Sequence, residues 1–158
     1  MARSLKRRRH ECKTDFRSRL ELLKSGKPRL VIRKTNRYII AQIVHSTSAQ
    51  DSIMFGASSK DLLTKGWPQE LAGSLKSIPA AYLTGFLIAK LAKAKVKEAI
   101  LDLGMQRSQP KTRLFAALKG AIDGGLLIPH SEEALPAYSE ISKNPKTGKL
   151  IEQIKGKL

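Results

Sequence analysis

The chain of 158 residues has few aromatic residues, one cysteine and no long apolar run. Phe, Tyr and Trp together make up 5% of it, so base stacking on a single-strand platform cannot be the main source of any affinity for nucleic acid. The single Cys12 excludes an internal disulfide framework and fits a reducing compartment. Apolar runs such as residues 86–89 are too short to span a bilayer, and the basic N-terminus lacks the apolar stretch of a secretory signal. We therefore expect a cytoplasmic protein.

Acidic residues are also scarce. Thirteen Asp and Glu accompany thirty Lys and Arg, which gives a net charge of +17. The first forty residues alone hold fourteen basic residues and three acids. A polyanion would relieve this repulsion, and each neutralised phosphate of a nucleic acid releases a counterion. A solvated tail or an address signal would explain the run Arg7–Arg9, but not the basic residues that continue to Arg37. The charge predicts nucleic-acid binding, through contacts to backbone and shape that suit structured RNA or duplex.

Hydrophobic periodicity indicates a mixed α/β fold in a chain long enough for about one domain. Three strands are expected first, at residues 29–34, 38–44 and 52–57. Further strands at 98–104 and 126–129 alternate with helices at 79–95 and 110–123. The order β-β-β-α-β-α-β predicts a mixed five-stranded sheet of ribonuclease-H-like topology with helices on its faces. The expected division is a basic N-terminal extension (1–27) with a short helix, the α/β domain (28–130) and a polar C-terminal extension (131–158).

Several local features follow from the same pattern. In the N-terminal helix we expect Thr14 as the N-cap, Gly26 as the stop and an inward stripe of Phe16, Leu20 and Leu23. Asn36 suits a positive-φ turn position, and residues 45–51 are expected to form a loop. In the third strand, Ile53, Phe55 and Ala57 should share one face. The helix at 79–95 should bury Ala80, Leu83, Leu87, Leu91 and Ala94. After a turn at 144–149, one weak helical turn is expected.

Catalytic and metal-binding chemistry find little support in the sequence. His10, His45 and His130 have no partner at ligand spacing, and one cysteine cannot build a thiolate site. A two-metal nuclease on such a sheet would need several acids at strand ends, but the first three expected strands contain none. Asp102 is the sole acid inside an expected strand apart from Glu98, which begins the strand at 98–104, and we expect Asp102 to pair with a nearby base or to cap the next loop. No enzyme activity, cofactor or metal is expected.

Basic residues form two clusters in the expected fold. Arg29, Arg33, Lys34 and Arg37 surround the first hairpin, together with Asn36 and Tyr38. Their guanidinium groups match phosphate geometry, and Tyr38 could stack on a base. The second cluster comprises Arg107, Lys111, Arg113 and Lys119, where the amides at the start of the helix near Pro110 would also favour a phosphate. In both clusters the alternative is an ordinary solvated surface. Lys90, Lys93, Lys95 and Lys97 either complement a helix dipole or contact RNA.

Several short segments of the chain are distinctive in sequence, and they follow one another in a characteristic order. They are the opening Lys6–Arg9 with Lys13–Asp15, then Ser25–Val44, Lys65–Trp67, Pro79–Phe86, Phe115–Ala121 and Ile128–Glu133. Over roughly residues 3–136 they resemble the large-subunit ribosomal protein L-eighteen family, archaeal type. After about Leu135 the chain departs from that pattern, so no C-terminal contact to ribosomal components is carried over.

The resemblance implies a structural constituent of the large ribosomal subunit that binds 5S rRNA and helps anchor it in the central protuberance. Implied partners are 5S rRNA, large-subunit rRNA and neighbouring large-subunit proteins, with no membrane. Family members contact the RNA through the basic N-terminal segment and the sheet and loops of the α/β domain. The matching positions are Arg7, Arg8, Arg9, Lys13, Arg17, Arg33, Lys34, Asn36, Arg37 and Tyr38, followed by Gln106, Arg107, Lys111 and Arg113.

Two other functional classes remain open from the sequence. One is a metal-dependent nuclease or RNA-processing factor on a ribonuclease-H-like sheet. The other is a generic nucleic-acid-coating protein, which the charge alone would permit.

Overall fold

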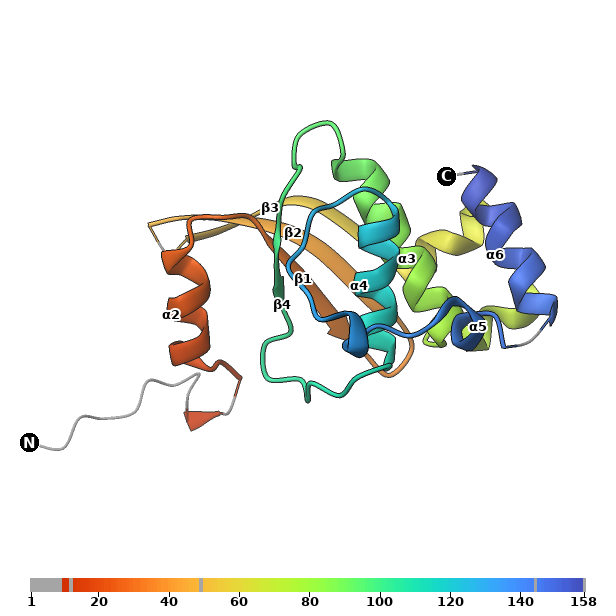
Figure 1. Ribbon diagram of the computed structural model, residues 1–158, viewed down its shortest axis with the longest axis horizontal. Helices are drawn as coiled ribbons and strands as arrows, with labels where there is room; N and C mark the ends of the chain where they lie inside the picture. Colours follow the sequence, from red (N-terminus) through yellow and green to blue (C-terminus); the bar gives the residue numbers. More distant parts are fainter. Residues whose placement is uncertain (1–9, 12, 49, 144, 158) are drawn as a thin grey trace, which may run out of the picture.

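The computed structural model describes residues 10–11, 13–48, 50–143 and 145–157. Their core is one open sheet of four strands in the order β3-β2-β1-β4 (Figure 1). These are β1 (Arg29–Lys34), β2 (Ile39–Thr47), β3 (Gln50–Ser58) and β4 (Ile100–Asp102). The pairs β1–β2 and β2–β3 are antiparallel, and β4 joins β1 in parallel. The mixed α/β class is confirmed, and so are the three consecutive antiparallel strands.

A fifth strand and the ribonuclease-H-like topology are not confirmed. Residues 126–129 make a single parallel bridge between Leu127 and Glu98, and no longer ladder among the described residues. The two bonds of this bridge join Leu127 N–H to Lys97 O and Ala99 N–H to Leu127 O, at 2.9 and 3.0 Å. Pro129 has no N–H with which to extend the pairing.

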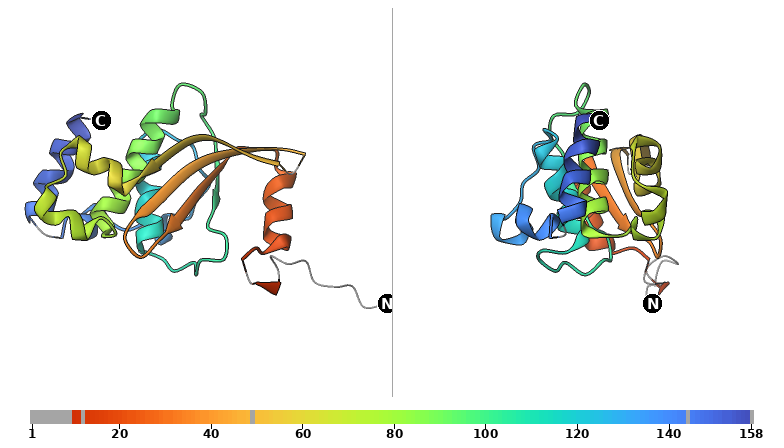
Figure 2. Two further views of the ribbon diagram at one scale, coloured as in Figure 1. Left: turned by 180° about the vertical axis from the view of Figure 1, so that it is seen from behind. Right: turned by 90° about the vertical axis from the view of Figure 1, so that its right-hand side faces the viewer.

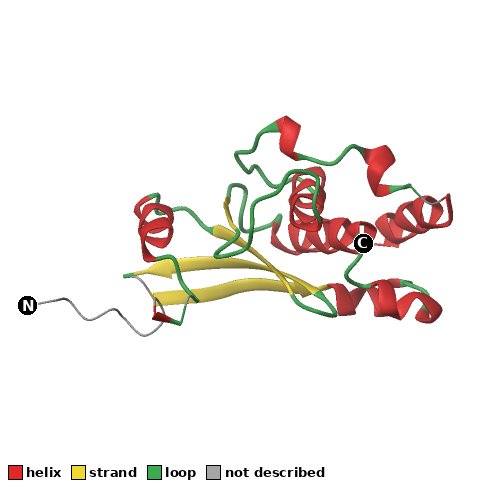
Figure 3. Ribbon diagram, turned by 90° about the horizontal axis from the view of Figure 1, so that it is seen from below, coloured by secondary structure: helices red, strands yellow, loops and turns green. Residues whose placement is uncertain are grey.

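Helical elements make up most of the remainder. They are α2 (Phe16–Lys24), η1 (Ser59–Lys65), η2 (Gln69–Ser74), α3 (Ile78–Ala92), α4 (Arg113–Asp123), η3 (Glu132–Ala134), α5 (Tyr138–Ile141) and α6 (Pro145–Lys157). Helix α3 packs on β2 and β3, while α4 packs on β1 and on α3. Leu30, Ile32 and Ile43 point from the sheet into this layer and are fully buried. Figure 3 shows α3 and α4 together on one side of the strands.

Two glycines allow α3 and α4 to approach each other closely. A Cβ atom on Gly85 would lie 1.8 Å from Ala117 O, and one on Gly120 would lie 1.9 Å from Tyr82 O. Each glycine therefore faces the backbone of the opposite helix. Because of this contact α3 is buried on nearly all sides from Ala80 to Ala89, and not along a stripe. Leu91, within the helix, faces solvent, and Ala94, beyond the end of the helix at Ala92, is exposed as well, although both were expected in the core.

The C-terminal segment is part of the core. Ile141, Ile151 and Ile154 are buried in the same cluster as the sheet and α3. The Lys155 ammonium lies 4.7 Å from the centre of the Tyr82 ring, and the Tyr82 hydroxyl donates to Asp123 at 2.6 Å. Figure 2 shows α6 at the end of the molecule away from α2, where it packs on α3. The expected turn at 144–149 and weak helical turn are wrong, because residues 145–157 form one helix.

A β-bulge changes the far half of the β2–β3 hairpin. Ile43 pairs with Phe55 but Val44 pairs with Ile53, which leaves Met54 as the extra residue. Beyond the bulge the alternation of β3 is inverted, because paired residues share a face of the sheet. Ile53 therefore does not lie with Phe55 and Ala57 as expected. The strands also run through most of the expected loop at 45–51 and turn near Ser48, which has a positive φ of 50°.

Helix α2 lies over the opposite face of the sheet from α3 and α4, and it differs from its expected form. Asp15, and not Thr14, caps it, by accepting from Arg17 N and Ser18 N. Leu20 faces solvent, whereas Ser18, Arg19 and Leu22 line a hollow shared with the sheet. No residue of α2 is fully buried, so charge and hydrogen bonding contribute much of its attachment.

Candidate nucleic-acid interface

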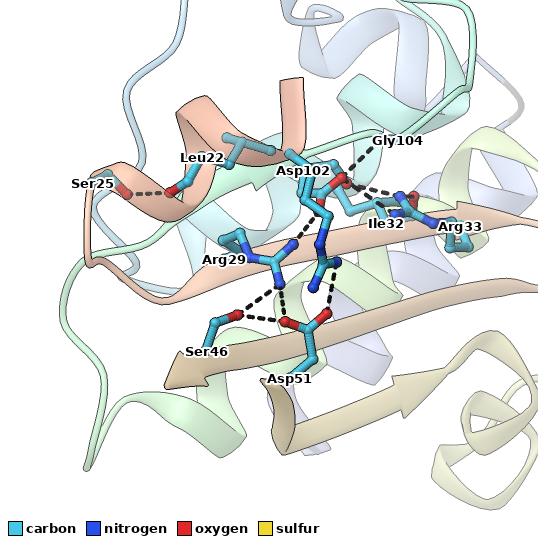
Figure 4. Close-up of polar contacts among 10 residues, drawn as sticks. Leu22, Ser25, Arg29, Ile32, Arg33, Ser46, Asp51, Asp102 and Gly104 are labelled. Atoms are coloured by element: carbon cyan, nitrogen blue, oxygen red, sulfur yellow. Dashed lines mark hydrogen bonds and ion pairs between the residues drawn. The ribbon is translucent and has the colours of Figure 1, made fainter. Parts of the chain in front are cut away.

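A buried ion-pair network lies at the centre of the sheet face that α2 covers (Figure 4). Arg29 Nη1 lies 2.7 Å from Asp102 Oδ2, and Arg29 Nη2 lies 2.7 Å from Asp51 Oδ1 and 2.9 Å from Ser46 Oγ. The Arg29 side chain is only 3% exposed. It therefore stabilises the sheet and is not available to a phosphate, although the sequence predicted it as an RNA contact.

Asp102 has the structural role expected of it. Its carboxylate accepts from Arg29, from Arg33 Nη2 at 3.3 Å and from the Gly104 amide at 2.8 Å. It thus pairs with two bases and caps the loop after β4. Arg33 also donates from Nη1 to Asp102 O and Ile32 O, at 2.9 and 3.0 Å. These bonds hold the partly exposed Arg33 side chain in one orientation.

Asp51 connects this network to α2. Arg19 Nη1 lies 2.9 Å from Asp51 Oδ2, and Ser46 Oγ donates to Oδ1. Partial burial opposes ionisation of Asp51, but the hydrogen bonds from Arg19, Ser46 and Arg29 outweigh it and lower the pKa to about 2. The β-bulge is what places Asp51 on this face, because without it the residue would point with Phe55 toward α3. Nothing in the alternation of the sequence predicts this.

Five of the expected RNA-binding residues line one groove beside the end of β1. The groove has a volume of about 630 Å³, and its expected members are Lys34, Gln106, Arg107, Lys111 and Arg113. Ile78, Gln109, Thr112 and Leu114, which the sequence did not single out, complete the lining. Four cations from β1, the loop after β4 and the start of α4 therefore converge on one concave surface. Such a surface matches the negative charge of a nucleic-acid backbone.

Gln106 ties the loop of this groove to the sheet. Its Nε2 donates to Ile32 O at 2.9 Å, and its Oε1 accepts from the Lys34 amide at 3.3 Å. The amide side chain therefore extends the pairing of β1 where β4 has ended. The polar atoms of the Gln106 side chain are therefore used to fix the loop to β1, and the loop holds the neighbouring Arg107 at the groove.

The start of α4 adds backbone donors to the same groove. The helix begins at Arg113, three residues later than expected, and Thr112 precedes it. The Thr112 hydroxyl donates to Gln109 O at 2.9 Å and makes no capping bond, so no side chain caps the first-turn amides. An uncapped helix N-terminus favours an anion. Lys111, at φ 58°, pairs with Glu140 at 3.2 Å and remains exposed.

The turn between β1 and β2 presents two more expected contacts. Asn36 and Arg37 are exposed at its tip. The turn is closed by Thr35, whose amide donates to Tyr38 O at 2.9 Å and whose hydroxyl oxygen accepts from the Tyr38 amide at 2.9 Å. Asn36 does not have the expected positive φ. Tyr38 is half-buried against the core, which leaves part of its ring for stacking.

The remaining expected contacts lie near the N-terminus. Arg7, Arg8 and Arg9 are outside the described residues, as is Cys12. Lys13 pairs with Glu11 at 2.7 Å and lines a hollow of about 200 Å³ together with Arg33 and Asp102. Arg17 is exposed on α2. The N-terminal segment therefore approaches the sheet at Arg33, next to the strand residue Lys34 of the groove.

The part of the chain that the structure describes has neither a metal site nor a membrane-spanning helix. No group of three or more His, Cys, Asp or Glu residues there could hold a metal ion. No helix there is long and apolar enough to cross a membrane.

Known proteins resemble the chain over most of its length. Residues 3–99 and 92–131 match the family described as "Ribosomal large subunit proteins 60S L5, and 50S L18". The large ribosomal subunit protein uL18 of Korarchaeum cryptofilum is 53% identical over 136 residues, which cover 85% of this chain and 68% of that protein. The uL18 of Methanoculleus marisnigri is 52% identical over 131 residues, 82% and 73% of the two chains. That of Methanoregula boonei is 41% identical over 155 residues, which cover 94% of this chain and 87% of the relative. The last match extends beyond Leu135, where the sequence had been expected to diverge.

Proposed function

Because the chain belongs to the family of large-subunit ribosomal proteins that includes uL18, we propose that it binds 5S rRNA and helps anchor it in the central protuberance. It is a structural constituent of the large ribosomal subunit and not an enzyme. Its partners are rRNA and ribosomal proteins, and we propose that it acts on ribosomes of the cytoplasm.

The observation that carries the proposal is the basic groove defined by Lys34, Arg107, Lys111 and Arg113. The phosphate groups of an RNA backbone bind to exposed cationic side chains. The groove presents four such side chains, which come from three separate elements. Gln106 makes the groove rigid by joining its loop to β1, so the cations are positioned before RNA arrives. A preformed arrangement of charges can read the shape of a folded RNA, which a flexible basic tail cannot.

The proposed contact surface continues from the groove to the N-terminus. It comprises the exposed turn residues Asn36 and Arg37, the partly exposed Tyr38 and Arg33, then Lys13 and Arg17. Arg7, Arg8 and Arg9 would extend it along the RNA. Arg29 is left out, because its side chain is buried between two carboxylates.

Filter binding with the pure protein tests the assignment. 5S rRNA should bind at least about tenfold more tightly than a scrambled RNA of equal length, which corresponds to roughly 1.4 kcal/mol. Duplex DNA should compete poorly at physiological salt. Equal affinity for all three nucleic acids would reject the 5S assignment and favour the coating protein. Release of cleaved RNA in the presence of magnesium or manganese would instead favour the nuclease.

A further inference from the structure

The β2–β3 hairpin carries neither Lys nor Arg, in a chain that is strongly basic. Residues 38–59 contain no Lys or Arg, although the whole chain has thirty. Asp51 is the one acid of this segment, and its carboxylate is bound by Arg19 and Arg29. An RNA backbone would find no cation along these two strands, so phosphate binding does not explain this surface.

Apolar side chains are exposed on the same hairpin. Ile53 is 59% exposed and Met54 40% exposed, next to each other at the β-bulge. The bulge places Ile53 on the opposite face of the sheet from Phe55 and Ala57. Figure 3 shows this half of the hairpin extending beyond α3 and α4 toward α2. The fold therefore keeps two large apolar side chains in solvent, at a site where the core cannot use them.

The outer strand β3 is also an open edge. It is the end strand of the sheet, and residues 50–54 and 56 are exposed. Natural proteins usually protect such an edge with Lys, Pro, a short strand or a β-bulge. β3 has nine residues without Lys or Pro, and of these devices it has only the bulge at Met54. Its backbone groups and apolar side chains are available to a partner that brings its own strand.

We propose that the outer edge of β3 docks a neighbouring protein of the large subunit, which adds an uncharged extended segment with apolar side chains to the sheet. The backbone groups of β3 would pair with this segment, while Ile53 and Met54 contact its apolar side chains. The chain would then have two faces of different chemistry, with RNA at the basic groove and protein at the neutral strand. The inference rests on the proposed function, since it places the chain in an assembled subunit.

Photo-crosslinking in assembled subunits tests the proposal. The photo-reactive amino acid p-benzoylphenylalanine is introduced at Ile53 of the full chain, and in a matched control at Lys34 of the basic groove. From Ile53 we expect a crosslink to another ribosomal protein, and from Lys34 a crosslink to rRNA. A crosslink from Ile53 to rRNA or to a second copy of this chain, or the absence of any crosslink, would overturn the proposal. If the probe at Lys34 gives no crosslink to rRNA, this result would contradict the proposed RNA contact at the groove and not the proposed protein contact at β3.

Charge variants give a second readout that does not depend on the probe. Ile53→Lys and Met54→Lys change exposed side chains, so both proteins should unfold at the temperature of the wild type. Each should compete about tenfold less well for incorporation into subunits, because docking would bury an unpaired ammonium. Leu91→Lys on α3 is the matched control, as Leu91 is similarly exposed, at 49%, and should incorporate normally. Affinity for free 5S rRNA should not fall in any of the three. Normal incorporation of both β3 variants would overturn the proposal.

Discussion

Arg29 and Asp102 form a buried ion pair, 2.7 Å long, that joins the first strand of the sheet to the last. β4 has only three residues, so few backbone bonds hold it to β1. The ion pair and the bonds from Arg33 to Asp102 supplement this short ladder. The loop that follows β4 carries Gln106 and Arg107 into the basic groove. The buried pair therefore helps to hold β4 in the sheet, whereas Gln106 holds the loop at the groove by its own bonds to β1.

Asp102→Asn should destabilise the protein without removing a contact to RNA. Breaking a buried pair from one side leaves a poorly compensated charge and typically costs about 3–5 kcal/mol. We expect the loss of unfolding free energy to lie near the lower end of this range, because Arg29 keeps Asp51 and Ser46 as partners. Urea unfolding measures this loss. Glu98→Gln is the control, since the Lys27–Glu98 pair is exposed to solvent and should contribute little to stability. At temperatures where Asp102→Asn is folded, its 5S rRNA affinity should match the wild type. An equal loss in both variants would contradict the structural role of the pair.

Gly85→Ala and Gly120→Ala should each be severely destabilising. A methyl group at either position would overlap a backbone carbonyl of the other helix, so α3 and α4 would have to move apart. Overpacking of this kind typically costs about 1–3 kcal/mol or more. Gly156→Ala in α6 is the matched control, because nothing lies within 4 Å of the added Cβ. It should be neutral or stabilising by up to about 1 kcal/mol, in accord with helix propensity. Thermal unfolding of the three variants distinguishes the close contact from a general effect of the substitution.

Hydrophobic periodicity correctly predicted the strands and helices whose formation depends on the local sequence. The strand at 29–34 has the expected bounds, and the helix expected at 110–123 is present as α4. The C-terminal helix was missed although Leu150, Ile151 and Ile154 have helical spacing, because the Pro and Gly of residues 144–149 suggested a turn. The bulge at Met54 was not predictable, since it results from pairing with β2 and leaves no mark on the alternation of β3.

The charged residues of the candidate site could be identified from the sequence, but which of them are buried could not. Lys34 of the first expected basic cluster and Arg107, Lys111 and Arg113 of the second line one groove, although the sequence indicated two separate clusters. Arg29 belongs to the same sequence pattern as Arg33, and alternation places both on one face. Only the tertiary positions of Asp51 and Asp102, which approach from other strands, decide that one arginine is buried and the other partly exposed.

The pKa of Asp51 predicts a defined acid sensitivity. Its folded-state pKa of about 2 lies below the ordinary value of 3.8, so the ionised carboxylate stabilises the fold above pH 3.8. This contribution is lost as the pH falls toward 2. Urea unfolding of Asp51→Asn should therefore show a deficit against the wild type at pH 5 that shrinks between pH 4 and 2. Glu70→Gln, at an exposed acid of η2, should follow the wild type throughout. A deficit that is independent of pH would mean that the Asp51 charge does not act through this network.

Removing the cations of the groove should change the salt dependence of RNA binding. In the triple variant Lys34→Gln, Arg107→Gln and Arg113→Gln, each lost phosphate contact should reduce the log–log salt slope by roughly 0.7–0.9 units. Three contacts would thus reduce it by roughly 2–3 units. The control removes the same charge at Lys93, Lys95 and Lys97, beyond the C-terminal end of α3. A small change in this control and a large one in the groove variant would assign the phosphate contacts to the groove. The reverse result would assign them to the lysines after α3.

Deleting residues 1–13 separates the contribution of the N-terminal segment from that of the folded body. These residues hold six of the thirty Lys and Arg and have almost no apolar periodicity, so the sequence predicts that they are mobile without RNA and add little to the core. Most of this segment lies outside the described residues, and the Lys13–Glu11 pair within it is exposed. We expect the unfolding midpoint to stay near that of the full chain, or to rise slightly as repulsion falls. If about four of the charges meet phosphates, the salt slope should drop by roughly 3 units.

A full-length variant with these six basic residues replaced by Gln keeps the length of the segment and serves as the control. It should lose the same slope as the deletion if charge is what matters. An unchanged slope in both proteins would indicate that the segment docks onto protein instead of RNA. A deletion that unfolds the body, with the Gln variant still folded, would mean that residues 1–13 pack against the sheet near Arg33 and are part of the domain.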